Sequence, residues 1–367
     1  MRPIISVPII IALLYRAYSR KSLTPSGLVV AGLTATAHAL NPWSLPLFLL
    51  LVFYVGGTQA TKVKHDIKAQ LTLSATGSHG GEGARTHIQV LANSVVATVL
   101  SLAHAWVLRH STDGGPTADC FSNGHHAADL LMVGIIANYA AVAADTFSSE
   151  LGILSKSPPR LITSPTLRVV PPGTNGGVTA TGLLAGSFGA FTIGVTTAVL
   201  LPFCTNGNTF LSTFPARVTW ILAMTVWGTF GSILDSVLGG LLQASVVDKK
   251  TGKVVEGSGG QKVLVHPSST KPGGAKDISG PSATTGSKLQ QTEAAANTAA
   301  LKGTRVTGTS AGTKSADETN HESRRVESGH DILDNNAVNV LMALIMSVGA
   351  MGVASYAWDL SILDAFA

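Results

Sequence analysis

The chain has few charged residues: they make up 12% of its 367 positions, against about 25% in a soluble domain. Its mean hydropathy is +0.33, although the chain includes a long polar stretch. This composition excludes an ordinary soluble enzyme and predicts an all-α, polytopic integral membrane protein. We therefore expect membrane lipid as its main partner and no nucleic-acid partner.

Cysteine is also scarce, with only Cys120 and Cys204 present. Two cysteines are too few for a disulfide scaffold or a thiolate metal site, and their spacing matches no metal motif. Both fall in loops that we place on the same side of the membrane, so a bridge and two unpaired thiols both remain open. The chain contains no Asn-x-Ser/Thr acceptor, so glycosylation offers no check on the topology.

Long apolar windows are what the chain has in quantity. A helix needs about 20 apolar residues to span a bilayer, and shorter ones are tolerated where neighbours or local thinning compensate. The sequence predicts about eight transmembrane helices, of which the third and fifth windows look short. They lie near residues 3–19, 24–40, 43–57, 88–108, 128–144, 178–203, 216–243 and 334–357.

Lysine and arginine predict the orientation of these helices. All but three of the 25 basic residues fall after the first, third, fifth or seventh window, the exceptions being Arg2, Arg109 and Arg217. Positive residues are retained on the cytoplasmic side of short loops. We therefore expect both termini outside the cytosol, in a multi-pass protein of an intracellular membrane. The first helix is expected to be retained, because its basic residues follow the apolar run instead of preceding it.

Residues 244–330 change abruptly in composition, becoming rich in Gly, Ser, Thr, Lys and Ala with almost no aromatic residue. Such a segment buries too little apolar surface to offset chain entropy, so we predict a disordered cytosolic insert. A linker without chemistry is favoured over a segment that contacts lipid or is phosphorylated. The chain is thereby divided into a membrane domain 1–243, the insert 244–330, and a final helix with its tail at 331–367.

Polar residues gather at the end of the fifth window. On a helix, Asn138, Asp145 and Ser149 share one face, and an ionisable side chain is expected to avoid lipid. Glu150 points elsewhere on an unbroken helix, so it shares a Mg²⁺ with Asp145 only if the helix ends or bends near Ser149. The alternative is that Asp145 caps a new helix that begins at Thr146.

Three further segments carry polar chemistry. The run at residues 170–177 is a rigid segment and a glycine turn that opens into an apolar helix, an arrangement that binds anions, although it lacks the lysine of a P-loop. Asp235 lies on a glycine stripe and needs a cation, a lysine or a polar ligand as partner. Asn335 and Asn336 stand with carboxylates at the start of the last helix, where an ordinary N-cap is the alternative.

At these residues the sequence resembles the transmembrane protein 19 family, also called domain of unknown function 92. The resemblance covers most of residues 25–243 and 331–360, and the insert at 244–330 departs from it. It is carried by motifs that occur in a fixed order, namely Arg85 with Gln89 and Asn93, residues 144–152 with 155–156, residues 171–178, Asp235 and Ser236 with Gly239, and residues 333–339.

The plant branch of that family includes the phytyl-phosphate kinase of the tocopherol pathway. The resemblance therefore implies an isoprenyl-phosphate kinase of isoprenoid metabolism that uses a nucleotide triphosphate and Mg²⁺ at the cytosolic membrane face. As a hypothesis on roles, Asp145, Glu150 and Asp235 are catalytic and hold Mg²⁺. The residues expected to bind the substrate or its phosphate are Arg85, Asn93, Asn138, Lys156, Gly173, Thr174, Asn175, Gly176, Gly177, Asn335 and Asn336.

Two other functions fit the same residues. Intramembrane carboxylates and glycine-broken helices also mark the paths of transporters and lipid-binding proteins. The positions of Asp145 and of the cluster at residues 331–336 near helix ends favour chemistry at the membrane surface, whereas the depth of Asp235 in its window leaves transport open. A membrane scaffold, whose polar groups only satisfy one another, predicts that Asp145→Asn leaves function intact.

Overall fold

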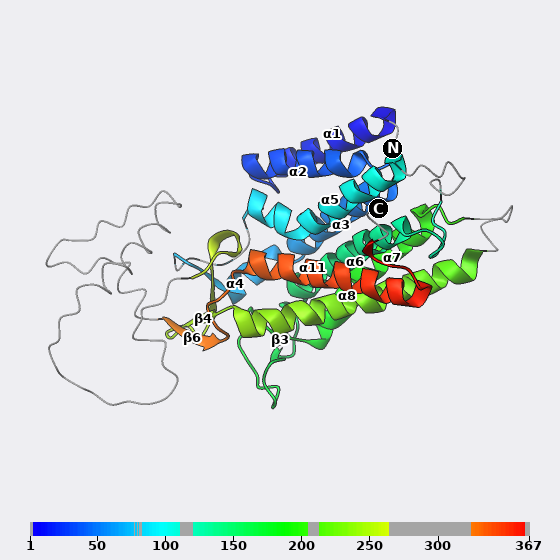
Figure 1. Cartoon of the computed structure of the whole chain (residues 1–367). Helices are drawn as coiled ribbons and strands as arrows, with labels where there is room; N and C mark the ends of the chain where they lie inside the picture. The colour runs from blue at the N-terminus through cyan, green and yellow to red at the C-terminus, as the bar shows by residue number, and fades with distance from the viewer. Residues whose placement is uncertain are drawn as a thin grey trace, which may run out of the picture.

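The computed structural model describes residues 3–76, 78, 80, 83–110, 120–204, 213–263 and 324–363. Long helices form one bundle, and short strands lie at one of its ends (Figure 1). Each of the eight apolar windows holds a helix. These are α1 (Pro3–Ser19), α2 (Pro25–Ala39), α3 (Leu45–Lys62), α5 (His87–His110), α6 (Ala128–Gly152), α7 (Ala180–Leu200), α8 (Phe214–Leu242) and α11 (Asn335–Trp358).

Six of these helices, α3, α5, α6, α7, α8 and α11, are long and apolar enough to cross a membrane. The 17-residue helix α1 is apolar but shorter. Large apolar side chains such as Leu184 and Phe188 point outward, with 73% and 57% of their surface exposed, as expected of a surface that faces lipid. The predicted class, a polytopic helical membrane protein, is confirmed.

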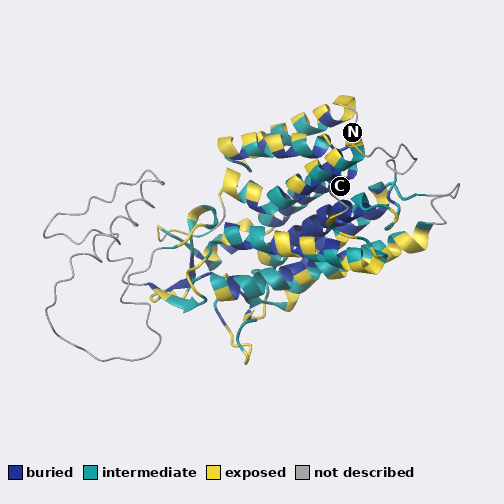
Figure 2. Cartoon of the chain, viewed as in Figure 1, coloured by how far each residue is buried: buried dark blue, intermediate teal, exposed yellow. Residues whose placement is uncertain are grey.

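Helix α6 forms the centre of the bundle. In its most apolar window 83% of the residues are buried, against 22% in α8, and its ribbon is dark blue over most of its length in Figure 2. The helix continues without a break through Asp145 to Gly152, eight residues beyond the predicted end. The alternative in which Asp145 caps a helix starting at Thr146 is therefore wrong.

Glycines let α7 and α8 approach α6 closely. A Cβ added at Gly189 of α7 would lie 2.6 Å from the carbonyl oxygen of Ala143, and one at Gly228 of α8 would lie 2.5 Å from that of Ala140. Real side chains do not tolerate such contacts, so only glycine fits at these crossings. The glycines at these crossings therefore serve close helix packing.

A four-stranded sheet covers one end of the bundle, and we call it the cap. Its strands lie in the order β1 (Leu73–Ser74), β5 (Val254–Glu256), β4 (Ser245–Asp248) and β6 (Arg324–Ser328). Strand β1 is parallel to β5, and β4 is antiparallel to both of its neighbours. The predicted disorder of 244–330 is thus corrected at both ends, because paired valines at 246–247 and 254–255 are buried in this sheet. Residues 264–323 lie outside the described residues.

The smaller elements complete the capped end. Helix α4 (His65–Leu71) follows α3, and η3 (Ser258–Gly260) follows β5. Strands β2 (Arg160–Leu161) and β3 (Gly177–Val178) form a separate antiparallel pair. All of these elements lie in loops that we predicted to be cytosolic.

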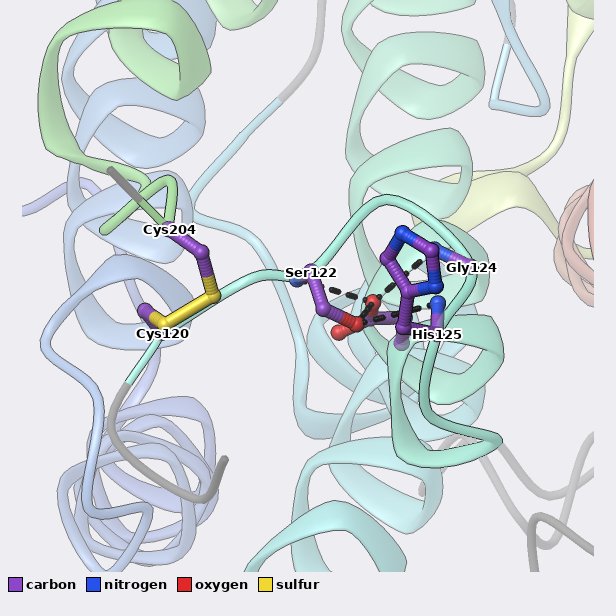
Figure 3. Close-up of a disulfide and its surroundings, with 6 residues drawn as sticks. Cys120, Ser122, Gly124, His125 and Cys204 are labelled. Atoms are coloured by element: carbon purple, nitrogen blue, oxygen red, sulfur yellow. Dashed lines mark hydrogen bonds between the residues drawn. A yellow bond between two sulfur atoms is a disulfide. The ribbon is translucent and has the colours of Figure 1, made fainter. Parts of the chain in front are cut away.

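A disulfide joins Cys120 and Cys204 at the opposite end of the bundle, where both chain ends also lie (Figures 1 and 3). Of the two alternatives that the sequence left open, the bridge is the one formed. Next to it, the backbone N–H groups of Ser122 and Gly124 donate to the carboxylate of Asp129 at 3.0 and 3.1 Å. These bonds fix the loop that leads into α6.

Candidate functional site

A cavity of about 910 Å³ lies between the sheet and the adjoining ends of the helices. Its lining comes from α5, α6, α7, α8 and α11 on one side and from β1, β4, β5 and η3 on the other. The volume falls at the upper end of the range of about 300–1,000 Å³ that is typical of ligand sites. Polar side chains supply much of its wall.

The cavity gathers almost every residue that the sequence singled out, although these residues are spread over some 250 positions of the chain. Asn138 is the exception, because its side chain is fully buried two helical turns deeper in α6. The predicted residues that line the cavity are Arg85, Asn93, Asp145, Glu150, Lys156, Gly173, Thr174, Asn175, Gly176, Gly177, Asp235, Asn335 and Asn336.

The carboxyl groups of Asp145 in α6 and Asp235 in α8 lie close enough to interact directly. Two carboxylates at such a separation repel, so the pair requires a shared proton or a cation. Asp235 lies two turns before the end of α8 and lines the same cavity. Asp235 therefore lies deep in its apolar window because the cavity reaches that far into the bundle.

Asn339 of α11 adds an amide to the carboxyl pair. With one orientation of the amide, its nitrogen donates to Asp235 Oδ1 at 3.2 Å and to the carbonyl oxygen of Asn335 at 3.1 Å. With the other orientation, oxygens of three residues converge, and a hard cation such as Mg²⁺ is bound by oxygens of this kind. The residues present thus fit a divalent cation.

Glu150 does not join the carboxyl pair. Its Oε2 accepts a hydrogen bond from Lys68 of α4 at 2.5 Å, and its Oε1 accepts one from the hydroxyl of Thr61 at 2.6 Å. In the described part of the chain, no three His, Cys, Asp or Glu residues gather as metal ligands. A cation here would depend on Asp145 and Asp235 together with amide and carbonyl oxygens.

Three long helices begin at the cavity wall. The side chains of Thr86, Thr179 and Asp334 accept hydrogen bonds from the first turns of α5, α7 and α11 respectively, and all three line the cavity. At α5 the bonding is reciprocal, because the backbone N–H of Thr86 donates to the side chain of Gln89 at 2.9 Å. Helix starts carry partial positive charge, so together they favour an anionic ligand.

Two cationic side chains lie in the same wall. Within the described residues, neither Arg85 nor Lys156 forms a salt bridge with a carboxylate. The Nη2 of Arg85 donates to the hydroxyl of Thr61 at 3.1 Å, and Lys156 is exposed. Both cations are therefore available to a phosphate in the cavity.

The glycine turn shapes the wall and has few free donors. Gly173 and Gly176 adopt positive φ angles of 86° and 78°, which favour glycine. The backbone N–H groups of Thr174, Asn175 and Gly177 donate within the protein, to Pro171 O, Ser245 Oγ and Thr174 O. The positive partial charge at the wall of this site therefore comes mainly from the helix starts, of which the sequence signals the one at α5 by the Thr-x-x-Gln spacing of residues 86–89.

Fold and site together define a multi-pass helical membrane protein with a polar cavity at one end of its bundle, in which a carboxyl pair adjoins helix starts and cations. Residues 8–347 match the family described as "Integral membrane protein DUF92". The chain belongs to this family, as the motifs at the cavity indicated.

Three curated relatives share parts of the chain. It is 35% identical over 254 residues to Protein PGR of Arabidopsis thaliana, which covers 69% of this chain and 83% of the relative. It is 30% identical over 197 residues to the Uncharacterized membrane protein MJ0933 of Methanocaldococcus jannaschii, covering 54% and 65%. Protein VTE6, chloroplastic, of Arabidopsis thaliana is 28% identical over 169 residues, covering 46% and 45%. No solved structure matches.

Proposed function

We propose that the protein is a lipid-phosphate kinase that transfers a phosphoryl group from a nucleoside triphosphate to an isoprenyl monophosphate in this cavity. The observation that carries the proposal is the meeting of a carboxyl pair, three helix starts and the cations Arg85 and Lys156, which form no salt bridge among the described residues, in one cavity at the end of a membrane bundle. The family resemblance supplies the isoprenyl acceptor, whose tail would remain in the bilayer while its phosphate enters the cavity.

The residues divide into two groups in this proposal. Asp145, Asp235 and Asn339 would hold Mg²⁺, which supplies neutralisation of phosphate charge when it is bound. Arg85 and Lys156 attract and orient the phosphates of donor and acceptor. Phosphoryl transfer depends mainly on alignment and charge stabilisation, so this division matches what the reaction demands.

The sheet contributes by covering the cavity. Strands β4 and β5 bury Val246 and Val254, with 2% and 4% of their surface exposed, directly beside the polar wall. Apolar side chains on this wall would lower the local dielectric and so strengthen electrostatic contacts to the phosphates.

The test is transfer of labelled phosphate from ATP, CTP, GTP or UTP to a panel of isoprenyl monophosphates, by purified protein in lipid with Mg²⁺. We expect diphosphate product from the wild type and a loss of about 100-fold or more with Asp145→Asn, the scale seen when a charge-stabilising group is removed. The matched control is Asp66→Asn, because the side chain of Asp66 is fully exposed and does not line the cavity. No product from the wild type across the panel would refute the proposal.

A further inference from the structure

Lys68 and Glu150 form an ion pair buried beside the cavity. Lys68 is 8% exposed, and its Nζ donates to Glu150 at 2.5 Å and to the carbonyl oxygens of Thr61 and Ala60 at 2.6 and 3.2 Å. The ammonium group thus joins the end of α3 to the last turn of α6. All three of its N–H donors are used.

The hydroxyl of Thr61 connects this pair to Arg85. It lies 2.6 Å from Glu150 Oε1, and the Nη2 of Arg85 lies 3.1 Å from the same hydroxyl oxygen. A hydroxyl has a single proton, and Arg85 offers only donors, so Thr61 accepts from Arg85. Two acceptors lie within reach of the Thr61 proton, Gly57 O at 3.0 Å and Glu150 Oε1 at 2.6 Å. The contact with the carboxylate is shorter and charge-assisted, so Thr61 donates to Glu150. Glu150 therefore orients the Thr61 hydroxyl, and this hydroxyl in turn orients the Arg85 guanidinium.

The backbone of Arg85 is also fixed. Its N–H donates to Ser22 O at 3.0 Å, and its carbonyl oxygen accepts from the N–H of Thr24 at 3.0 Å. A Cβ added at Gly57 of α3 would lie 3.6 Å from Arg85 Nη1 and 3.4 Å from Thr146 Cγ2. The guanidinium group therefore lies against α3 beside Thr146, the neighbour of Asp145.

We propose that Glu150 is a positioning residue, which acts through Thr61 to hold the Arg85 guanidinium toward a phosphate bound beside the carboxyl pair. The inference rests on the proposed function only in requiring that the ligand carries phosphate. Glu150 orders Thr61, Thr61 occupies one donor of Arg85, and the remaining donors of the planar fork are left for phosphate oxygens. Holding the side chain in place before binding reduces the entropy that binding must cost.

A double-mutant cycle tests this inference by binding alone. The probe is inorganic pyrophosphate with Mg²⁺, titrated calorimetrically into the full chain in lipid nanodiscs. We expect Arg85→Met to weaken binding by about 30-fold, because one charged contact is lost. We expect Thr61→Val to weaken it by about 5-fold, because only part of that contact is lost. In the Arg85→Met background, Thr61→Val is expected to have no further effect, because its only influence on the phosphate passes through Arg85.

Thr61→Val suits the cycle because valine has nearly the shape of threonine and leaves the carbonyl oxygen that binds Lys68 in place. The matched control is Thr98→Val in α5. The hydroxyl of Thr98 donates to Ser94 O at 2.7 Å, and Thr98 does not line the cavity. Glu150→Gln is expected to behave as Thr61→Val does, with its effect also absent when Arg85 is methionine. Thermal unfolding of each variant confirms that it is folded.

Two results would overturn the inference. One is that the effects of Thr61→Val and Arg85→Met multiply, which would make Glu150 and Thr61 a structural brace independent of Arg85. The other is that wild-type protein binds no pyrophosphate. Pyrophosphate binding with the expected cycle but without transfer to any isoprenyl phosphate would instead refute the kinase and leave this inference standing.

Discussion

The carboxyl pair depends on one glycine contact a single helical turn away. Gly231 of α8 and Ala141 of α6 lie four residues before Asp235 and Asp145, respectively. A Cβ added at Gly231 would lie 2.5 Å from the Cβ of Ala141, about 1 Å inside the ~3.5 Å at which carbon atoms meet. In Gly231→Ala the two helices must therefore separate or rotate at the turn next to the pair.

Gly231→Ala has two expected effects, one on stability and one on the cation site. Overpacking costs about 1–3 kcal/mol, and the better helix propensity of alanine returns about 1 kcal/mol. The geometry of the cation site is disturbed as well, because Mg²⁺ demands near-ideal distances to its ligands. We expect Mg²⁺ to bind at least about tenfold more weakly to Gly231→Ala than to the wild type, since ligand distances must hold within about 0.2 Å.

Unfolding followed with and without Mg²⁺ measures both effects. At a concentration 100 times its dissociation constant, Mg²⁺ stabilises the wild type by about 2.7 kcal/mol, and tenfold weaker binding reduces this to about 1.4 kcal/mol. The control is Gly352→Ala in α11, where an added Cβ meets nothing within 4 Å. A full Mg²⁺ effect in Gly231→Ala, or none in the wild type, would refute the reasoning.

Three further outcomes are expected. Cys120→Ser lowers the unfolding free energy, by up to about 4.6 kcal/mol for the 84-residue separation if chain entropy alone decides; an unchanged unfolding temperature would contradict this. Thr179→Ala removes the cap of α7 and costs about 1 kcal/mol, whereas an unchanged stability would show that Gly182 N–H finds another acceptor. Asn138→Leu raises the unfolding temperature without changing pyrophosphate binding. Both amide atoms of this buried side chain lack a partner in the described structure, and each unmade hydrogen bond costs about 1–3 kcal/mol. Weaker pyrophosphate binding would place Asn138 in the site.

Hydropathy predicted the helices well because lipid-facing surfaces must be apolar along their whole length. The window at 3–19 coincides with α1, and the other windows differ from their helices mostly at the ends. The main error is α6, which continues eight residues further. Its last two turns carry Asp145 and Glu150, whose partners Asp235 and Lys68 belong to other elements. The local sequence does not show these partners, so it could not predict that the helix continues through two carboxylates.

The cap and the ion pair escaped sequence reasoning for the same physical reason. Composition averaged over 244–330 hid two valine pairs, and their burial needs a strand at 324–328 that follows some 70 residues later. Glu150 was predicted to point away from Asp145 on an unbroken helix, which agrees with its bonds to Lys68 and Thr61. The partner of Glu150 depends on where α4 packs against α6, and a tertiary contact of this kind cannot be read from the local sequence.

The bond between Cys120 and Cys204 has a consequence for where this chain works. Disulfides persist in oxidising compartments and are rare where glutathione and thioredoxin keep thiols reduced. The two cysteines lie at the end of the bundle remote from the cavity. We therefore expect the host membrane to separate an oxidising lumen or exterior, which meets the cysteines, from a reducing compartment, which supplies whatever enters the cavity.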